Sequence, residues 1–209
     1  MLDARARALT GPALDRAAVW LAAAGVRPLT LTALGWLAGL GACFAIVTGA
    51  WTTALVLWLV NRIFDGLDGA VARRVGPTDL GGFLDIVADF SIYAGFVLAV
   101  AIEVPDARLA CIALMVAYYV SGTAFLALSS LLERRRVASH TDGRSLRFVG
   151  GLAEGTETVI VYVLFTVFPE HAALIAWIFA AAVTVTALQR IAEGVVALAA
   201  RPRTQVLSS

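Results

Sequence analysis

Two acidic motifs lie close together in an otherwise apolar chain: residues 65–73 read DGLDGAVAR and residues 81–89 read GGFLDIVAD. Each motif holds two aspartates, three residues apart in the first and four apart in the second. On a helix either spacing places both carboxylates on one face. Ionised groups at membrane depth are costly without a counter-charge, and carboxylate oxygens suit the hard cations Mg²⁺, Mn²⁺ and Ca²⁺. The motifs therefore predict a site for divalent cations.

The rest of the chain is strongly apolar. Of its 209 residues 60% are hydrophobic, and the mean hydropathy is +0.86, whereas soluble domains are about half apolar. Six apolar segments are each long enough to cross a bilayer, which takes ~20 residues. They cover residues 29–49, 51–73, 80–103, 107–132, 149–168 and 171–195. We therefore predict an all-α polytopic membrane protein with six transmembrane helices, packed as a bundle through short connections.

The two ends of the chain differ from this apolar part. In residues 1–26 charged side chains alternate with apolar ones, which predicts an amphipathic helix in the membrane interface, interrupted near Gly11-Pro12. Residues 27–200 would then form the six-helix domain, and residues 201–209 a flexible tail.

The distribution of arginine predicts the orientation. The chain has sixteen arginines and no lysine, and six spans with a cytoplasmic N-terminus place every arginine except Arg108 on the cytoplasmic side. Both termini and both acidic motifs would then be cytoplasmic. The formal net charge of +1 indicates no nucleic-acid partner.

The connection between the two motifs is short, so we expect the helices that carry them to be antiparallel neighbours. Their four carboxylates would then converge on one or two cations. Two metal ions that bridge a diphosphate fit such a site.

The pattern D-x-x-D-G-x-x-A-R, a short spacer and G-x-x-x-D-x-x-x-D resembles the signature of the CDP-alcohol phosphatidyltransferase family. Every fixed position is present, although the spacer of seven residues is one shorter than is typical. The resemblance implies that Asp65, Asp68 and Asp85 bind Mg²⁺ or Mn²⁺, as two ions, and that Asp89 is both a further ligand and the general base. It also implies contacts with the CDP-lipid at Gly69, Ala72, Arg73, Thr78, Gly81 and Thr32.

The resemblance further implies a reaction and partners. A hydroxyl of a small polar alcohol would attack the β-phosphorus of CDP-diacylglycerol, CMP would leave, and a phospholipid would form. The family implies a homodimer in contact with membrane lipid, and for this chain a bacterial inner (cytoplasmic) membrane protein with a cytoplasmic active site.

Candidate residues for the acceptor alcohol lie outside the motifs. Arg134, Arg135 and Arg147 flank the connection between the fourth and fifth apolar segments, and Arg190 lies in the last segment. Guanidinium groups bind phosphate bidentately, which favours a phosphorylated acceptor such as inositol phosphate or glycerol phosphate. The alternative for the first three is positive-inside topology and contact with anionic lipid. A charge within an apolar helix, as at Arg190, usually faces a cavity.

Glu157 is a further candidate, at the start of the fifth segment. It could bind a polyol or a cationic acceptor, or pair with Arg147 or Arg190, and the alternative is a simple interaction with the helix dipole. The resemblance implies a basic residue near here in phosphatidylinositol-phosphate synthases, where this chain has Gly155.

Two other classes of function are alternatives to the transferase. A cation or proton transporter would use the aspartates as its pathway, but such residues usually lie at the middle of spans in repeated folds. The acids here gather at one predicted membrane face, and the sequence has no visible repeat. A non-catalytic scaffold would not require all four aspartates.

Overall fold

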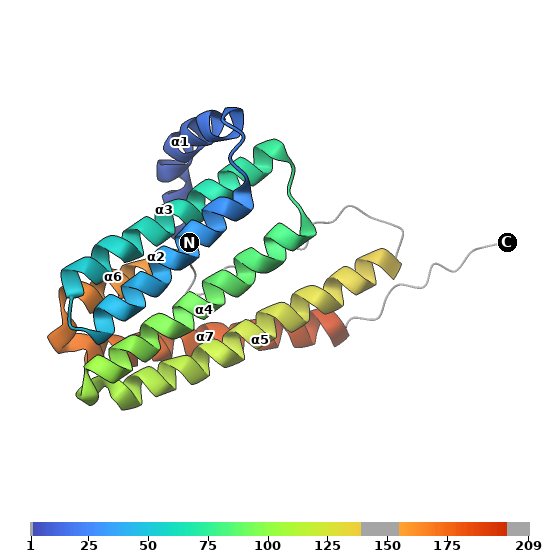
Figure 1. The fold of residues 1–209 in the computed structure, drawn as a ribbon. Helices are drawn as coiled ribbons and strands as arrows, with labels where there is room; N and C mark the ends of the chain where they lie inside the picture. The colour runs from blue at the N-terminus through green and yellow to red at the C-terminus, as the bar shows by residue number, and fades with distance from the viewer. Residues whose placement is uncertain (1, 139–154, 200–209) are drawn as a thin grey trace.

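The computed structural model describes residues 2–138 and 155–199, and these ranges are all-α, as predicted (Figure 1). The helices are α1 (Leu2–Ala23), α2 (Pro28–Val47), α3 (Trp51–Val75), α4 (Asp79–Glu103), α5 (Arg108–Ala138), α6 (Gly155–Val167) and α7 (Ala172–Ala199), with the 3-10 turns η1 (Pro105–Ala107) and η2 (Pro169–His171) before α5 and α7.

Four helices of the described ranges are long and apolar enough to cross a membrane, namely α2, α4, α5 with η1, and α7 with η2. They coincide with four of the six predicted spans, and the chain is a polytopic membrane protein. Helix α3 has 25 residues, but the first acidic motif lowers the hydropathy of its second half. Helix α6 has 13 residues, which is about 20 Å against a hydrocarbon core of about 30 Å. Spanning by α3 and α6 therefore stays a prediction.

Helix α2 organises the half of the bundle that carries the acidic motifs. It packs along both α3 and α4, while the closest partner of α5 is α7 (Figure 1). Helices α3 and α4 meet directly through side chains, where Trp58 contacts Phe96 and Arg62 contacts Asp89, but α2 packs more closely on each of them than they do on each other. Glycines allow this arrangement: a Cβ on Gly35 would lie 3.0 Å from Cβ of Phe64 on α3, and one on Gly39 would lie 2.8 Å from Ile92 on α4.

A buried aromatic cluster joins α3, α4 and α6. Trp58, Phe96, Tyr162 and Phe165 are fully buried, and the rings of Phe96 and Tyr162 stack with centroids 4.3 Å apart. The Tyr162 hydroxyl donates a hydrogen bond of 2.8 Å to the carbonyl of Tyr93 on α4. Trp58 of this cluster lies about two turns before Asp65 on α3, so the cluster joins the two helices that carry the aspartates.

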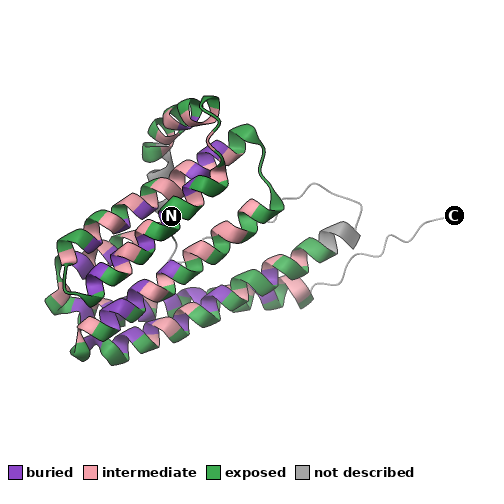
Figure 2. Cartoon of the chain, in the orientation of Figure 1, coloured by how far each residue is buried: buried purple, intermediate pink, exposed green. Residues whose placement is uncertain are grey.

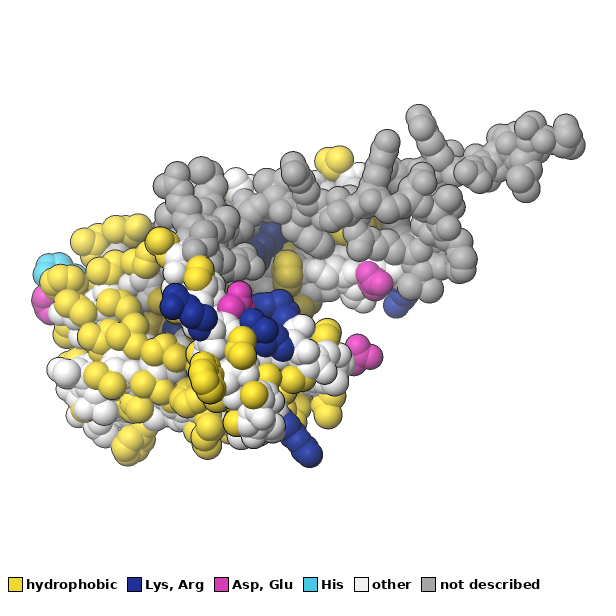
Figure 3. Space-filling view, turned by 90° about the horizontal axis from the view of Figure 1, so that it is seen from above, with side chains coloured by type: hydrophobic (Ala, Val, Ile, Leu, Met, Phe, Trp, Pro, Cys, Tyr) yellow, Lys and Arg dark blue, Asp and Glu magenta, His cyan; other side chains and the backbone are white. Residues whose placement is uncertain are grey.

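The outer faces of the helices are apolar. Figure 2 shows exposed positions along the outside of the bundle, and Figure 3 shows hydrophobic side chains over much of the face seen from above. Large exposed apolar side chains include Phe44, Leu109, Ile178 and Val196. An exposed apolar surface of this extent marks contact with a membrane or with another protein.

Helix α1 lies beside α3 at one end of the bundle (Figure 1). Its Ala18 is fully buried, and Leu14 packs with it against Ala70 and Val71 of α3. Leu9 and Trp20 on other sides of α1 are 82% and 78% exposed. One face of α1 is thus bound to the bundle and the rest is open, while its predicted place in the membrane interface stays a prediction.

Two predicted breaks in helices were wrong. Helix α1 continues through Gly11-Pro12, because proline removes a single backbone donor and the remaining hydrogen bonds carry the helix past it. Helix α5 continues through residue 133 to Ala138, where glutamate and arginines are good helix formers, so the connection predicted for 133–148 starts later. The predicted tail, 201–209, lies outside the described residues.

Candidate active site

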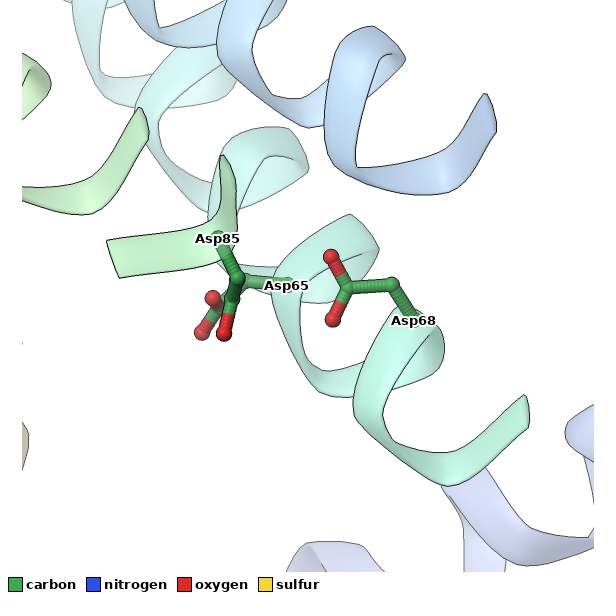
Figure 4. A group of neighbouring side chains, drawn as sticks. All are labelled: Asp65, Asp68 and Asp85. Carbon is green, nitrogen blue, oxygen red and sulfur yellow. The ribbon is translucent and has the colours of Figure 1, made fainter. Parts of the chain in front are cut away.

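Three aspartates from two helices form a compact group. Asp65 and Asp68 lie on successive turns of α3, and Asp85 reaches them from the second turn of α4 (Figure 4). One carboxylate oxygen from each lies within 4.8 Å of the other two. Three hard oxygen donors at this spacing fit a divalent cation such as Mg²⁺ or Mn²⁺. The sequence prediction that the two motifs converge is confirmed for these three residues.

Helix α2 supports this group from the third side. The Thr32 hydroxyl donates a hydrogen bond of 2.7 Å to Oδ2 of Asp68. Asp68 is buried, with 6% of its surface exposed, so this bond satisfies one lone pair of a carboxylate that has little access to water. On the same helix, the Gly35 carbonyl accepts a hydrogen bond of 2.8 Å from the Asn61 side-chain amide of α3. These two bonds fix the register between α2 and α3 at the site.

Asp89 lies one turn further along α4 and is not one of the three grouped aspartates. Its Oδ1 accepts a hydrogen bond of 2.8 Å from Nη2 of Arg62, a residue of α3. Nη1 of the same guanidinium lies 3.5 Å from Oδ2 of Asp65. Arg62 therefore neutralises part of the charge of the cluster from within the bundle.

A cavity of about 430 Å³ opens beside the three-aspartate group. Its walls come from the start of α2, the end of α3 and the start of α4. They include most of the residues that the sequence motif assigns to the CDP-lipid, namely Thr32, Gly69, Ala72, Thr78 and Gly81, together with Asp68 and Asp85. The motif positions thus gather around one hollow that borders the carboxylates.

The N-terminus of α4 forms one wall of this cavity. Thr78 caps the helix, and its Oγ1 accepts a hydrogen bond of 3.1 Å from the backbone N–H of Gly81. A Cβ on Gly81 would lie 3.0 Å from that oxygen, so a larger residue there would require a small shift of the cap. The N-terminal end of a helix carries partial positive charge and unpaired N–H groups, which attract phosphate. This wall is therefore suited to an anionic part of a ligand.

Arg73 has a different position from the other motif residues. Its side chain is 70% exposed, and its Nη2 lies 4.0 Å from Oδ1 of Asp15 on α1. The neighbouring Arg74 donates a hydrogen bond of 3.2 Å to the Asp15 carbonyl. Arg73 is not a wall residue of the 430 Å³ cavity, so its assignment to the CDP-lipid stays a prediction.

A second cavity, of about 480 Å³, lies further along α4, and none of the motif aspartates is among its wall residues. It is enclosed by α4, α5, α6 and α7, and its walls are mostly apolar and aromatic. The next residues of α4 after Asp89, including Phe90 and Tyr93, form one wall, and Arg190 of α7 forms part of another. Arg190 donates a hydrogen bond of 2.8 Å to the Ser121 hydroxyl and lies over the ring of Phe125, 5.2 Å from its centroid.

Two other acceptor candidates with described side chains, Glu157 and Arg134, are not wall residues of this cavity. Glu157 is in the first turn of α6, where Gly155 and Thr158 are wall residues and Glu157 is not. Arg134 is exposed near the end of α5. Arg135 lies in the same helix, but its side chain is outside the described residues, as is Arg147. Among the candidates whose side chains the structure describes, Arg190 is a wall residue of the 480 Å³ cavity, and Glu157 and Arg134 are not.

The sequence analysis missed the role of Arg62 and its neighbours. Arg62 counted there only toward membrane orientation, although it precedes Asp65 by three residues and so shares its helix face. Tyr93 follows Asp89 by four residues on α4 and accepts a hydrogen bond of 2.9 Å from Nη1 of Arg62. Spacings of three and four residues place Arg62 on the same helix face as Asp65, and Tyr93 on the same helix face as Asp89.

Comparisons with known proteins agree with this geometry. The model of the CDP-alcohol phosphatidyltransferase family matches residues 26–189. Inner membrane protein YnjF of Escherichia coli (strain K12) is 38% identical over 204 residues, 95% of this chain and 97% of YnjF. An archaetidylinositol phosphate synthase of Pyrococcus horikoshii is 36% identical over 77 residues, 36% of this chain and 41% of that protein.

Solved structures of phosphatidylinositol phosphate synthase from Mycobacterium tuberculosis have the same fold. The structure with CDP-DAG bound has a TM-score of 0.70 at 21% identity, over 87% of this chain and 93% of that chain. The structure in complex with manganese and citrate has a TM-score of 0.63 at 25% identity, over 87% and 88%. With the family match over most of its length and the motif in place, the chain is an enzyme of the CDP-alcohol phosphatidyltransferase family.

Proposed function

We propose that the protein transfers a phosphatidyl group from CDP-diacylglycerol to a hydroxyl of a small phosphorylated alcohol and releases CMP. The observation that carries this proposal is the three-aspartate group at the edge of a cavity lined by the family's CDP-lipid positions. The 430 Å³ cavity holds the family's CDP-lipid positions and a helix N-terminus, and the 480 Å³ cavity holds Arg190. Phe90 and Tyr93, which follow Asp89 on α4, are wall residues of the 480 Å³ cavity, so an acceptor bound there would lie near the end of the second acidic motif.

The solved relatives support the choice of donor and metal. One Mycobacterium tuberculosis structure contains CDP-DAG and the other contains manganese. In this chain Asp65, Asp68 and Asp85 would hold Mg²⁺ or Mn²⁺, expected as two ions, and the assignment of Asp89 as a further ligand stays a prediction. When bound, the metal would offset charge on the diphosphate and on the departing CMP.

The residues of the chain would divide the reaction between them. The amide groups at the start of α4 would bind the diphosphate, and the small side chains at Gly69 and Ala72 would leave room for the nucleotide. Asp89 would accept the proton of the acceptor hydroxyl as its oxygen bonds to the β-phosphorus. The bond from that phosphorus to the bridging oxygen would break, and CMP would leave with the electron pair. A carboxylate contributes here more by its position than by its strength as a base.

Arg190 supports a phosphorylated acceptor. Among the described residues that line the 480 Å³ cavity, Arg190 is the one with a positive charge. Its contacts with Ser121 and Phe125 fix its orientation. A guanidinium held in an apolar cavity binds phosphate more strongly than it does in water. The archaetidylinositol phosphate synthase that matches part of the chain is consistent with an acceptor of this class.

We also propose the membrane arrangement expected from the sequence: six spans, with both termini and the active site in the cytoplasm, in a bacterial inner membrane. The C-terminal ends of α3, α5 and α7 and the N-terminal end of α4 lie at one end of the bundle, together with the acidic motifs (Figure 1). The relative from Escherichia coli is an inner membrane protein. We expect a homodimer, as in other members of the family.

Identification of the product lipid tests this proposal. Purified protein with CDP-diacylglycerol and Mn²⁺ is incubated with glycerol 3-phosphate, inositol phosphate, inositol, serine or choline, and the lipids are analysed by mass spectrometry. We expect a new phospholipid with one phosphorylated acceptor. A product formed with an uncharged or cationic alcohol alone would contradict the role given to Arg190.

A further inference from the structure

Tyr93 of α4 connects the carboxylate pocket with the 480 Å³ cavity. All four motif aspartates line one small pocket together with Arg62. The Tyr93 hydroxyl accepts a hydrogen bond of 2.9 Å from Nη1 of Arg62, and Tyr93 is itself a wall residue of the 480 Å³ cavity. One hydrogen bond thus joins a wall residue of the pocket to a wall residue of the cavity.

The Tyr93 hydroxyl has a hydrogen that the described part of the chain does not use. A phenol can accept hydrogen bonds and also donate one, yet within residues 2–138 and 155–199 the Tyr93 hydroxyl only accepts, from Arg62. The neighbouring Tyr162 differs, because its hydroxyl donates its hydrogen to the Tyr93 carbonyl at 2.8 Å. Polar groups away from bulk water are normally paired, so the half-buried Tyr93 is suited to donate to a ligand.

The neighbours of Tyr93 hold its ring in place. The guanidinium carbon of Arg62 lies 5.3 Å from the centroid of the Tyr93 ring. The rings of Trp58 and Tyr162 meet the Tyr93 ring edge to face, with centroids 6.4 Å and 6.1 Å away. A hydroxyl whose oxygen accepts a hydrogen bond from a cation is also a stronger donor, because the accepted bond polarises the O–H group. Tyr93 therefore needs little reorganisation to bind a ligand oxygen.

Arg190 supplies a complementary group from a different wall of the cavity. Helix α7 contributes Arg190, and α4 contributes Tyr93. The walls are otherwise mostly apolar and aromatic, so a hydroxyl of a bound alcohol would lose its water there without gaining a partner. An alcohol with its phosphate at Arg190 and a hydroxyl at Tyr93 would avoid this cost.

We propose that Tyr93 binds the acceptor alcohol and contributes to its selection: the Tyr93 hydroxyl donates a hydrogen bond to a hydroxyl oxygen of the acceptor, other than the one that attacks phosphorus. The acceptor is then a polyol phosphate with at least one hydroxyl besides the nucleophile. This inference rests on the proposed function, since it places the acceptor in the 480 Å³ cavity.

The test compares Tyr93→Phe with the wild type in the binding of three phosphate monoesters. Glycerol 3-phosphate and inositol phosphate carry free hydroxyls, and propyl phosphate carries none. The Kd values are measured by phosphorus NMR titration of purified protein in detergent with Mg²⁺ and without CDP-diacylglycerol. Phenylalanine keeps the ring of Tyr93, and Arg62 keeps its hydrogen bonds to Asp89 and Asn61.

Tyr93→Phe should weaken the binding of the two hydroxylated esters on the order of 10-fold and leave that of propyl phosphate unchanged. Arg190→Gln should weaken the binding of all three, because each carries the phosphate. Tyr162→Phe is the matched control, since it also removes one phenol oxygen from the aromatic cluster, but one whose hydrogen is bonded to the protein. It should lower the unfolding temperature and leave the three Kd values unchanged.

The proposal would be overturned if Tyr93→Phe bound the hydroxylated esters as tightly as the wild type does, or lost as much affinity for propyl phosphate as for glycerol 3-phosphate. Should Tyr93→Phe not fold, wild-type protein that binds propyl phosphate as tightly as the hydroxylated esters, or binds none of the three, would also overturn it. CMP release is measured separately. If the wild type released no CMP while Tyr93→Phe weakened the binding of the hydroxylated esters alone, the transferase function would fail and the assignment of Tyr93 would hold.

Discussion

Neutralising one carboxylate of the three-aspartate group should stabilise the metal-free protein. Asp85→Asn keeps the size of the side chain and removes its charge, which lies within 4.8 Å of oxygens of Asp65 and Asp68. At an effective dielectric constant of about 20, two unit charges at this distance repel each other by about 3.5 kcal/mol. Because Asp85 is half-buried, solvent and salt screen part of this repulsion. We therefore expect a gain of about 1–3 kcal/mol in the free energy of unfolding without metal.

The same substitution should remove the response to metal. Wild-type protein at an Mn²⁺ concentration of about 100 times Kd should gain about 2.7 kcal/mol, because the cation binds only the folded state. Asp85→Asn should gain much less, so that Mn²⁺ removes most of the variant's advantage in stability, or reverses it where that advantage is below about 2.7 kcal/mol. The assay is unfolding in detergent, first with EDTA and then with Mn²⁺.

Asp106→Asn in η1 is the control, since Asp106 is exposed at the other end of the bundle. It should leave both stabilities near those of the wild type. A variant Asp85→Asn that is less stable than wild type in EDTA, or that Mn²⁺ stabilises as much, would refute the reasoning.

Three further predictions concern packing and the two cavities. Gly39→Ala would place a Cβ 2.8 Å from the buried Ile92 and should lower the free energy of unfolding by about 1–3 kcal/mol. A second substitution, Ile92→Val, should restore part of this loss. An unchanged stability of Gly39→Ala would contradict the close approach of α2 and α4. Ala72→Leu adds bulk to the wall of the 430 Å³ cavity and should raise KM for CDP-diacylglycerol about 10-fold; a rise in KM for the acceptor alone would assign this cavity to the wrong substrate. Arg190→Gln should raise KM for a phosphorylated acceptor about 10-fold or more and leave KM for CDP-diacylglycerol unchanged; equal rises in both would contradict a separate acceptor cavity.

The sequence predicted the fold class and most of the site because both depend on helical periodicity. The spacing of Asp65 and Asp68 placed them on one face of a helix, and the short connection brought Asp85 to the same end of the bundle. The motif positions Gly69 and Thr78 likewise border one cavity, because a motif that ends one helix and starts the next lies around a single connection.

Helical periodicity indicates which residues share a face of one helix, but not which residues of another helix pack against that face. The sequence therefore grouped the four aspartates, which line one small pocket, but it did not predict that Arg62 lines the same pocket and pairs with Asp89. It also did not predict that α2 packs more closely on α3 and α4 than these two pack on each other, because the close approach of α2 depends on Gly35 and Gly39 meeting side chains far away in the sequence. Interhelical contacts of this kind follow from packing, and a single sequence carries little trace of them.

The most direct test of the central claim is CMP release from CDP-diacylglycerol by the purified protein, with a phosphorylated acceptor and Mn²⁺. We predict release that requires the acceptor, stops on addition of EDTA, and is lost in folded Asp89→Asn. No release from folded, Mn²⁺-loaded protein with any acceptor of the panel, or release that Asp89→Asn leaves intact, would contradict the account of this site.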